Sequence, residues 1–195
     1  MAAKHPNSLR IIAGQWRGRK LHFPSIEGLR PTPDRVRETL YNWLQNHIAN
    51  LRVLDCFAGS GALGLEALSR GAAHCTFAEQ NRDATRAIEQ HLHLLQCDRG
   101  RVLSTDVLNL LKQPAPQAFD LVLLDPPFRK NLIEPCLQRL QQNHWLQPQA
   151  WIYLECEKEL TPLPLPSHWE LYRSKQAGQV SYHLIRTHPP LKKLT

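Results

Sequence analysis

The stretch LRVLDCFAGSGALG, residues 51–64, constrains the fold of this chain more than any other. A short apolar strand around Val53 and Leu54 leads to Asp55, and a glycine-rich turn and the start of an apolar helix follow. Glycines at such a turn let the backbone bend sharply and approach a ligand that a Cβ atom would displace. A strand, a glycine turn and a helix in this order predict a nucleotide-type pocket at the carboxyl end of the strand.

Beyond this turn the chain alternates between strand and helix patterns. We expect strands at 52–56, 74–78, 101–104, 119–124 and 150–155, and helices at 62–69, 82–95 and 133–142. Such alternation predicts a parallel sheet covered by helices on both faces. The end of the chain differs, because segments 169–175 and 180–186 flank Ala177 and Gly178 and so predict an antiparallel hairpin.

The segment before residue 51 has two parts. Residues 9–23 contain two short strand-like runs around Gly14 to Gly18, which predicts a hairpin with Trp16 at its tip. A helix is then expected with Thr32 as its N-cap and Pro33 at its first position. Its buried stripe would run through Val36, Leu40, Trp43 or Leu44, and His47 or Ile48, with Arg35 and Arg37 outside it.

The charge is unevenly distributed over the 195 residues. Residues 1–50 hold eight Lys and Arg against three Asp and Glu, whereas residues 51–195 hold sixteen against fourteen. A basic arm before a nearly neutral domain favours a polyanionic partner such as nucleic acid, although a merely solvated basic surface is the alternative. We therefore expect a basic arm at 1–30, a catalytic domain at 31–188 and a basic tail at 189–195.

Composition narrows the class of protein further. Hydrophobic residues make up 42%, so a proper core is expected. No apolar run is long enough to span a bilayer, and the first ten residues lack the apolar core of a secretory signal. The five cysteines form no CxxC pair and the histidines no ligand cluster, so we expect neither disulfides nor a metal site, and a cytoplasmic location.

The glycine turn matches two cofactor classes. Residues 59–64 fit G-x-G-x-x-G, the dinucleotide fingerprint, but Asp55 lies four residues before the first glycine, where it would repel a pyrophosphate. A carboxylate there suits the ammonium group of S-adenosylmethionine. Glu79 ends the next strand and can bind both ribose hydroxyls, and Asp106 follows the third, placed to accept from the adenine amine with Val107 beside the ring.

The fourth strand of this domain ends in Asp125-Pro126-Pro127-Phe128, the most specific motif in the chain. It resembles the [D/N/S]PP[Y/F/W] motif of amino-group methyltransferases. The exocyclic amine of a nucleobase is a poor nucleophile, because its lone pair is delocalised into the ring. Hydrogen bonds to Asp125 and to the Pro126 carbonyl would localise that lone pair, and Phe128 would stack on a base that is flipped out or unpaired.

The whole chain resembles the RsmD-type family of 16S ribosomal RNA guanine-N2 methyltransferases. The stretches that match are RIIAGQWRGRKL, RPTPDRVRETLYNWL, VLDCFAGSGALGLEALSRGA, FAEQN and LVLLDPPF. The resemblance implies an α/β fold: a Rossmann-like class I S-adenosylmethionine-dependent methyltransferase with a seven-stranded, mostly parallel sheet, an antiparallel C-terminal hairpin and a small N-terminal β-hairpin. It also implies methylation of guanine N2 at position 966 of the 16S RNA.

The resemblance assigns roles to residues with matching motifs. The cofactor S-adenosyl-L-methionine would be bound by Asp55, Phe57, Gly59, Gly61, Glu79, Asp106 and Val107, and the guanine by Asp125, Pro126 and Phe128. RNA contacts are expected from Arg10, Trp16, Arg17, Arg19, Lys20, Arg30 and Arg35. The expected partner is 16S RNA, within the small ribosomal subunit or an assembly intermediate, and the expected state is a monomer away from membranes.

Three alternatives remain open at this stage. The same four-residue motif serves enzymes that methylate adenine N6 or cytosine N4 in DNA, although these usually carry a sizeable recognition domain. A non-catalytic RNA-binding assembly factor is the second alternative, and an NAD-dependent oxidoreductase is the third. Past Phe128 no functional residue is expected; Glu155 and Glu157 are interpreted as a solvated pair on one strand face, and Tyr182 and His183 are assigned no role.

Overall fold

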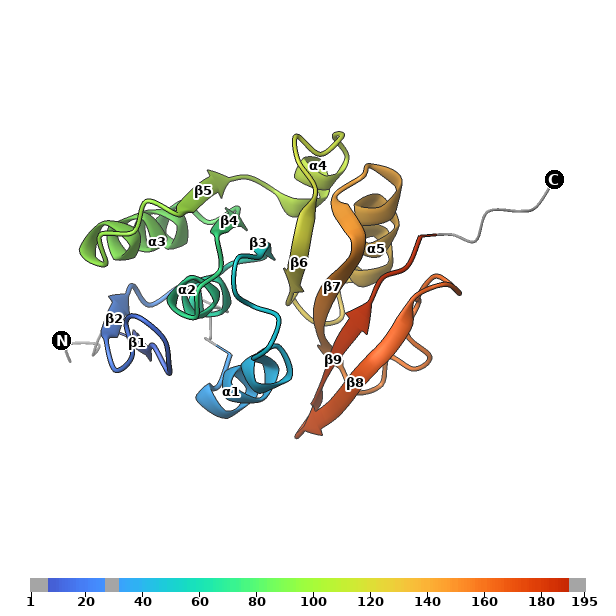
Figure 1. The fold of residues 1–195 in the computed structure, drawn as a ribbon, viewed down its shortest axis with the longest axis horizontal. Coiled ribbons are helices and arrows are strands. Elements are labelled where there is room, and N and C mark those ends of the chain that lie inside the picture. The colour runs from blue at the N-terminus through green and yellow to red at the C-terminus, as the bar shows by residue number, and fades with distance from the viewer. Residues whose placement is uncertain (1–6, 27–31, 190–195) are drawn as a thin grey trace. The chain divides into compact units, whose positions relative to one another are not determined.

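The computed structural model describes residues 7–26 and 32–189 of the chain. It divides into two compact units, Met1–Val107 and Leu108–Thr195. The main sheet has seven strands, in the order β5-β4-β3 in the first unit and β6-β7-β9-β8 in the second (Figure 1). Within the described residues, no helix has the length and apolar character needed to cross a membrane.

Three parallel strands form the sheet of the first unit. β3 (Arg52–Cys56) pairs with β4 (His74–Glu79), and β4 pairs with β5 (Gly100–Ser104). The helix α2 (Ala62–Ser69) packs on β3 and β4, and α3 (Arg82–Leu94) packs on β5 and β4. Asn81 caps α3, because its side chain accepts hydrogen bonds from the N–H groups of Asp83 and Ala84.

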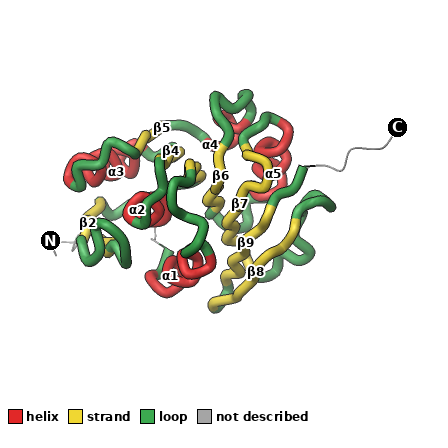
Figure 2. Tube along the Cα trace, in the orientation of Figure 1, coloured by secondary structure: helices red, strands yellow, loops and turns green. Residues whose placement is uncertain are grey.

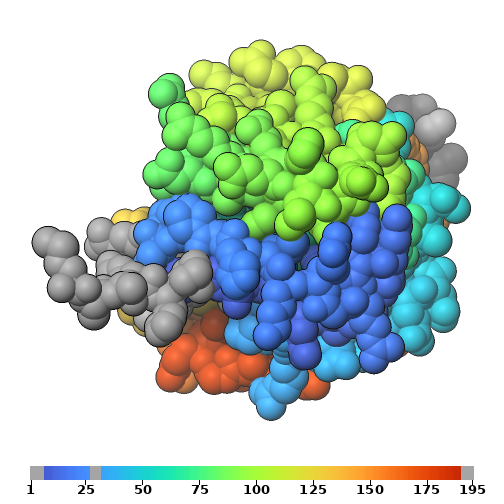
Figure 3. Space-filling model, turned by 90° about the vertical axis from the view of Figure 1, so that its left-hand side faces the viewer, coloured from blue at the N-terminus to red at the C-terminus, as the bar shows by residue number. Residues whose placement is uncertain are grey.

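The expected N-terminal hairpin is confirmed. β1 (Asn7–Arg10) pairs in antiparallel fashion with β2 (Lys20–Phe23) as a separate two-stranded sheet. Figure 3 shows this hairpin, in blue, on the same face of the first unit as α3, in green, and β2 contacts α3. The Nε2 of His91 on α3 lies 2.8 Å from the carbonyl oxygen of His22, which joins the two elements.

The loop of this hairpin is held by the end of α2. The N–H of Trp16 donates to Oγ of Ser69 at 3.0 Å, and this hydroxyl donates to the carbonyl of Ala13 at 2.6 Å. Gly14 approaches so closely that a Cβ there would lie 1.9 Å from the carbonyl oxygen of Ser69. The loop of the hairpin is therefore fixed to the end of α2 by hydrogen bonds of the Ser69 hydroxyl and by a close backbone contact.

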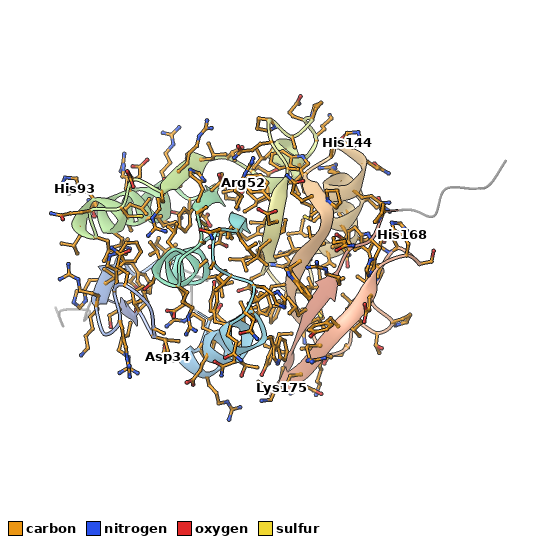
Figure 4. All side chains as sticks on the ribbon, in the orientation of Figure 1. Asp34, Arg52, His93, His144, His168 and Lys175 are labelled. Carbon is orange, nitrogen blue, oxygen red and sulfur yellow. The ribbon has the colours of Figure 1, made fainter. Side chains whose placement is uncertain are left out.

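The first helix begins one residue later than predicted and buries a residue that was expected outside its stripe. α1 runs over Asp34–Trp43, and its N-cap is Pro33 rather than Thr32, because Pro33 has an extended ψ of 145°. Val36, Leu40, Leu44 and Ile48 are buried as predicted. Arg37 is fully buried as well, since its guanidinium donates to the carbonyl of Arg10 at 2.8 Å and to Asp34 at 2.6 Å; Asp34 is labelled in Figure 4.

The second unit ends in antiparallel strands, which confirms the predicted C-terminal hairpin. β6 (Phe119–Leu124) is parallel to β7 (Leu146–Glu157), which pairs antiparallel with β9 (Val180–Arg186), and β8 (Glu170–Ala177) lies at the edge beside β9. The helix α5 (Ile133–Gln142) has the predicted bounds. A long loop, green in Figure 2, joins β7 to β8 and contains the proline-rich segment 161–166.

Two features of the second half were not predicted. β7 starts four residues earlier than expected, where Leu146 pairs with Phe119 and Trp145 stacks on the Phe119 ring. The short helix α4 (Val107–Leu111) follows β5. Two side chains donate hydrogen bonds to its backbone carbonyl groups, Arg139 to that of Leu108 and Asn143 to that of Leu111. Partners this distant in sequence leave no local pattern.

Candidate cofactor and base-binding sites

The glycine turn of the first unit has an unusual backbone. Phe57, Gly59 and Gly61 have φ angles of 60°, 54° and 77° respectively. Positive φ is readily adopted by glycine but costs an aromatic residue such as Phe57 on the order of 1–2 kcal/mol. Such strain is characteristic of sites that bind ligands, where surrounding structure compensates for it. The turn therefore forms at some cost between β3 and α2.

The amide groups of this turn are already engaged within the protein. The N–H of Gly59 donates to Oε2 of Glu79 at 2.8 Å, that of Gly61 to the carbonyl of Ala58 at 2.7 Å, and that of Gly64 to Oδ2 of Asp55 at 2.9 Å. In dinucleotide-binding turns, by contrast, the amide groups at the start of the helix face a pyrophosphate. The two acids bound here make the turn a poor site for a phosphate.

The third glycine of the motif has a packing role. A Cβ atom on Gly64 would lie 2.3 Å from the ring of Phe77 and 2.7 Å from Sγ of Cys75. Only glycine allows α2 to approach β4 this closely. The third glycine of the fingerprint is therefore explained by close packing of helix and strand and requires no phosphate.

Three acids follow one another along the carboxyl edge of this sheet. Asp55 lies in β3 and is 2% exposed, Glu79 ends β4 and is half-buried, and Asp106 follows β5 and is exposed. Each oxygen of Glu79 accepts one backbone N–H, from Gly59 and from Asn81, both at 2.8 Å. Because a carboxylate oxygen has two lone pairs, Glu79 can still accept hydrogen bonds from ribose hydroxyls. Val107 is buried directly after Asp106.

This arrangement fits S-adenosylmethionine. Carboxylates suit an ammonium group, two hydroxyls and an adenine amine, and the strained glycine turn lets the backbone approach a ligand. The cofactor has no phosphate, so it requires no free amide groups at the start of α2. The chemistry of the donor and acceptor set thus agrees with the cofactor expected from the sequence.

The Asp-Pro-Pro-Phe turn lies in the second unit, directly after β6. Asp125 is half-buried, Pro126 is buried, and Pro127 is exposed. Phe128 is 38% exposed, which is unusual for a large apolar side chain, and leaves its ring accessible to solvent. An acid, a fixed carbonyl and an accessible aromatic ring are the groups needed to bind and stack an unpaired base.

Sequence reasoning missed a buried pair beside this turn. The expectation that Glu155 is solvated is wrong: it is 5% exposed, and its Oε1 accepts a 2.8 Å hydrogen bond from the hydroxyl of Tyr153. Burial, then the negative charge of Glu155 and that of Asp125, raise the pKa of Tyr153 well above its usual value. The buried run at residues 150–156 of β7 reflects a strand covered on both faces, which an alternating pattern does not reveal.

The residues expected to contact RNA fall into three groups. Arg10, Arg17, Arg19, Lys20 and Arg35 are exposed, and Arg10 also lies 3.6 Å from Asp34. Trp16 is buried, with the guanidinium of Arg99 5.6 Å from its ring centre, so its ring packs in the first unit and does not form an open stacking face. Arg30 lies outside the described residues.

Comparison with known proteins identifies close relatives over almost the whole chain. The family model described as Conserved hypothetical protein 95 matches residues 9–186. A protein of Escherichia coli strain K12 named Ribosomal RNA small subunit methyltransferase D is 47% identical over 188 residues, covering 94% of both chains. A protein of the same name from Haemophilus influenzae is 49% identical over 181 residues, covering 91% of this chain and 93% of its own.

Solved structures show the same similarity. The structure of yhhF from Escherichia coli has a TM-score of 0.85 and 47% identity, and covers 93% of this chain and 99% of its own. SMU.776, a structure complexed with SAH, has a TM-score of 0.66 at 15% identity, covering 86% of this chain and 53% of its own, and so supports the fold alone. The predicted Rossmann-like methyltransferase fold is confirmed.

Proposed function

We propose that this chain, which belongs to the Conserved hypothetical protein 95 family, is an S-adenosylmethionine-dependent methyltransferase that modifies the N2 amine of one guanine, at position 966, in 16S ribosomal RNA. The observation that carries the proposal is an intact Asp125-Pro-Pro-Phe128 turn in a chain 47% identical to a protein named Ribosomal RNA small subunit methyltransferase D. The name of this relative supports methylation of small-subunit RNA, and the resemblance of the sequence to the RsmD-type family implies the guanine N2 specificity.

The first unit would bind the cofactor. Bound S-adenosylmethionine supplies a methyl group on a positively charged sulfur and leaves as S-adenosylhomocysteine when the amine has taken the methyl. Asp55 would attract the ammonium group, Glu79 would accept from the ribose hydroxyls, and Asp106 and Val107 would hold the adenine. Phe57, Gly59 and Gly61 would line the turn, where the backbone adopts positive φ.

The second unit would bind the base. Asp125 and the carbonyl of Pro126 would accept hydrogen bonds from the two N2–H groups, so that the nitrogen lone pair is localised and can form the new N–C bond. The amine releases one proton after transfer, and the carboxylate of Asp125, which accepts a hydrogen bond from the amine, can take it up. Phe128 would stack on the guanine ring, and catalysis would rest on positioning and on preorganised acceptors.

The basic hairpin would bind the RNA backbone. Arg10, Arg17, Arg19, Lys20 and Arg35 are exposed on the first unit and suit phosphate contacts, while Arg30 stays a sequence-based candidate. We infer from this a functional division into a basic arm at 1–30, a catalytic domain at 31–188 and a basic tail at 189–195. The 16S RNA would be bound within the small subunit or an assembly intermediate, by a cytoplasmic monomer.

A transfer assay tests the proposal. Purified protein and radiolabelled S-adenosylmethionine are incubated in parallel with unmethylated small ribosomal subunits, naked 16S RNA and duplex DNA, and the modified nucleoside is identified by mass spectrometry. We expect N2-methylguanosine at one site in the subunits or the RNA. Methyladenine or methylcytosine in DNA would overturn the substrate, and binding of NAD in preference to S-adenosylhomocysteine would overturn the cofactor.

A further inference from the structure

A buried carboxylate lies at the carboxyl end of β7 and has no role in the function proposed so far. Glu155 is 5% exposed and is held by the hydroxyl of Tyr153 at 2.8 Å; Tyr153 itself is fully buried. Burying a carboxylate is costly unless hydrogen bonds compensate, and the hydroxyl of Tyr153 supplies one such bond.

The strand register places Glu155 beside Asp125. In the parallel pair of β6 and β7, the last paired residues are Leu124 and Leu154. Asp125 directly follows Leu124 at the end of β6, and Glu155 directly follows Leu154 in β7. Residues opposite one another in a sheet point to the same face. The charge of Asp125 contributes to the raised pKa of Tyr153, whose hydroxyl is bonded to Glu155, and this agrees with the three groups lying together.

The other side of Glu155 is closed by β9. Tyr182 is opposite Glu155 in the antiparallel pair of β7 and β9 and is 1% exposed. Tyr153 and Tyr182 thus contribute apolar rings around the carboxylate. In such surroundings a hydrogen bond to Glu155 is strong, and a carboxylate facing an acceptor atom is strongly disfavoured.

Guanine is the base whose edge matches two adjacent carboxylates. Beside the N2 amine it presents N1–H, a second donor, whereas adenine and cytosine carry an acceptor ring nitrogen beside their amine. We propose that Glu155, oriented by Tyr153, accepts a hydrogen bond from N1–H of the target guanine next to the N2 amine held by Asp125, and so determines specificity for guanine. This inference rests on the proposed function and adds a specificity residue to it.

An analogue of guanine that cannot form this hydrogen bond provides the first test. 2-Aminopurine keeps the N2 amine but lacks O6 and carries an unprotonated N1, which would face Glu155 as a second acceptor; the variants at Glu155 and Tyr153 separate the effect of N1 from that of O6. The wild-type enzyme is assayed on 16S RNA that carries either guanine or 2-aminopurine at the target position. We expect kcat/KM for 2-aminopurine to be lower by about 100-fold or more, because a polar group of the site is left unpaired. Equal rates would overturn the proposal without any variant.

Two variants extend the test to the residues themselves. In Glu155→Gln the side-chain amide can donate an N–H to the N1 of 2-aminopurine. We therefore expect slower turnover of guanine, and the ratio of kcat/KM for guanine to kcat/KM for 2-aminopurine should fall to within about 10-fold. Tyr153→Phe removes only the hydroxyl that orients Glu155 and should narrow the ratio partly. Glu159→Gln, an exposed acid two residues beyond β7, is the control and should leave the ratio unchanged.

The outcomes separate the inference from the proposed function. If wild-type enzyme forms no N2-methylguanosine, the proposed function fails and the inference fails with it. If it forms N2-methylguanosine and Glu155→Gln keeps the full preference for guanine, only the inference fails. A merely structural role for Glu155 would lower both rates together and leave their ratio at the wild-type value. If Glu155→Gln does not fold, the ratio of the two kcat/KM values in Tyr153→Phe still tests the inference, and equal rates on the two bases in wild type would still overturn it.

Discussion

The N–H of Ile12 donates a 2.8 Å hydrogen bond to Oε2 of Glu66, a residue 54 positions further along the chain. The next amide, that of Ala13, donates to Oε1 of the same carboxylate at 3.0 Å. Glu66 lies on α2, the helix that starts at the glycine turn. The basic hairpin is thus fixed to the helix that shapes the candidate cofactor site, and it is positioned before any RNA is bound.

Glu66 is expected to be critical for stability. It is fully buried, and besides the two amides it contacts Nε of Arg70 at 2.7 Å and Nη1 of the buried Arg37 at 3.5 Å. Glu66→Gln removes the charge that compensates these guanidinium groups, so we expect the free energy of unfolding to fall by about 3–5 kcal/mol, as when one partner of a buried ion pair is lost. Urea denaturation measures this loss.

Hydrogen exchange tests whether the same residue holds the hairpin. In Glu66→Gln the amides of Ile12 and Ala13 should exchange faster, relative to the global stability of the variant, than in wild type. Glu38→Gln, an exposed acid on α1, is the matched control and should change neither quantity. Unchanged relative protection of the two amides in Glu66→Gln would show that the hairpin is held by other contacts.

The exposed basic residues of the hairpin are expected to act through phosphates. Arg17→Ala, Arg19→Ala and Lys20→Ala should each weaken RNA binding and each reduce the slope of log K against log salt concentration by about 1, with no change in affinity for S-adenosylhomocysteine. Fluorescence anisotropy at several salt concentrations measures both quantities. Arg86→Ala on α3, whose side chain pairs with Asp83, serves as a basic-surface control. Wild-type slopes in all three variants would contradict a phosphate-binding arm.

Stability should fall in mildly acidic solution because of His91. Burial lowers the pKa of His91 below 6.5; Nε2 faces the carbonyl of His22, and the buried Nδ1 has no partner for a second proton. Below about pH 6.5 the unfolded chain therefore binds a proton that the folded chain does not, and the free energy of unfolding decreases as pH falls towards the lowered pKa.

A variant isolates this contribution. His91→Gln keeps a side-chain donor for the carbonyl of His22 but does not titrate. Urea denaturation at pH 7.5 and pH 5.5 should show a smaller loss of stability for His91→Gln than for wild type. An equal loss in both proteins would assign the pH dependence to other groups, such as His74 and His183, whose pKa values burial also lowers.

Local patterns predicted most of the fold. The strands β3 and β6 and the helices α2 and α5 have the expected bounds. In each of them a run of regularly spaced apolar residues is bounded by glycine, proline or polar residues. The predicted exposure of side chains was wrong where partners distant in the sequence bury them. Arg37 was expected outside the buried stripe, either solvated or in contact with phosphate or cofactor, because two of its partners, the carbonyl of Arg10 and the carboxylate of Glu66, lie in other elements. Trp16 looked exposed because the Ser69 and Arg99 groups that cover it lie far along the chain.

Some residues of the candidate sites could be predicted from the sequence and others could not. Residues at the ends of strands, such as Asp55, Glu79 and Asp125, follow an apolar run directly and can be identified from the sequence. Glu155 lies inside a strand that is buried on both faces, and its hydrogen bond from Tyr153 depends on two neighbouring strands enclosing it. Packing across a sheet, unlike the end of a strand, leaves no signature in the local sequence.

The central claim is that Asp125 activates the amine, and one paired measurement tests it directly. Methyl transfer to the substrate RNA and the Kd for S-adenosylhomocysteine are measured for wild type, for Asp125→Ala and for the exposed-acid control Asp98→Ala. We predict that Asp125→Ala lowers kcat by about 100- to 1,000-fold, comparable to losing a preorganised acceptor, with Kd unchanged and the control active. Turnover in Asp125→Ala within a few-fold of wild type would contradict the mechanism.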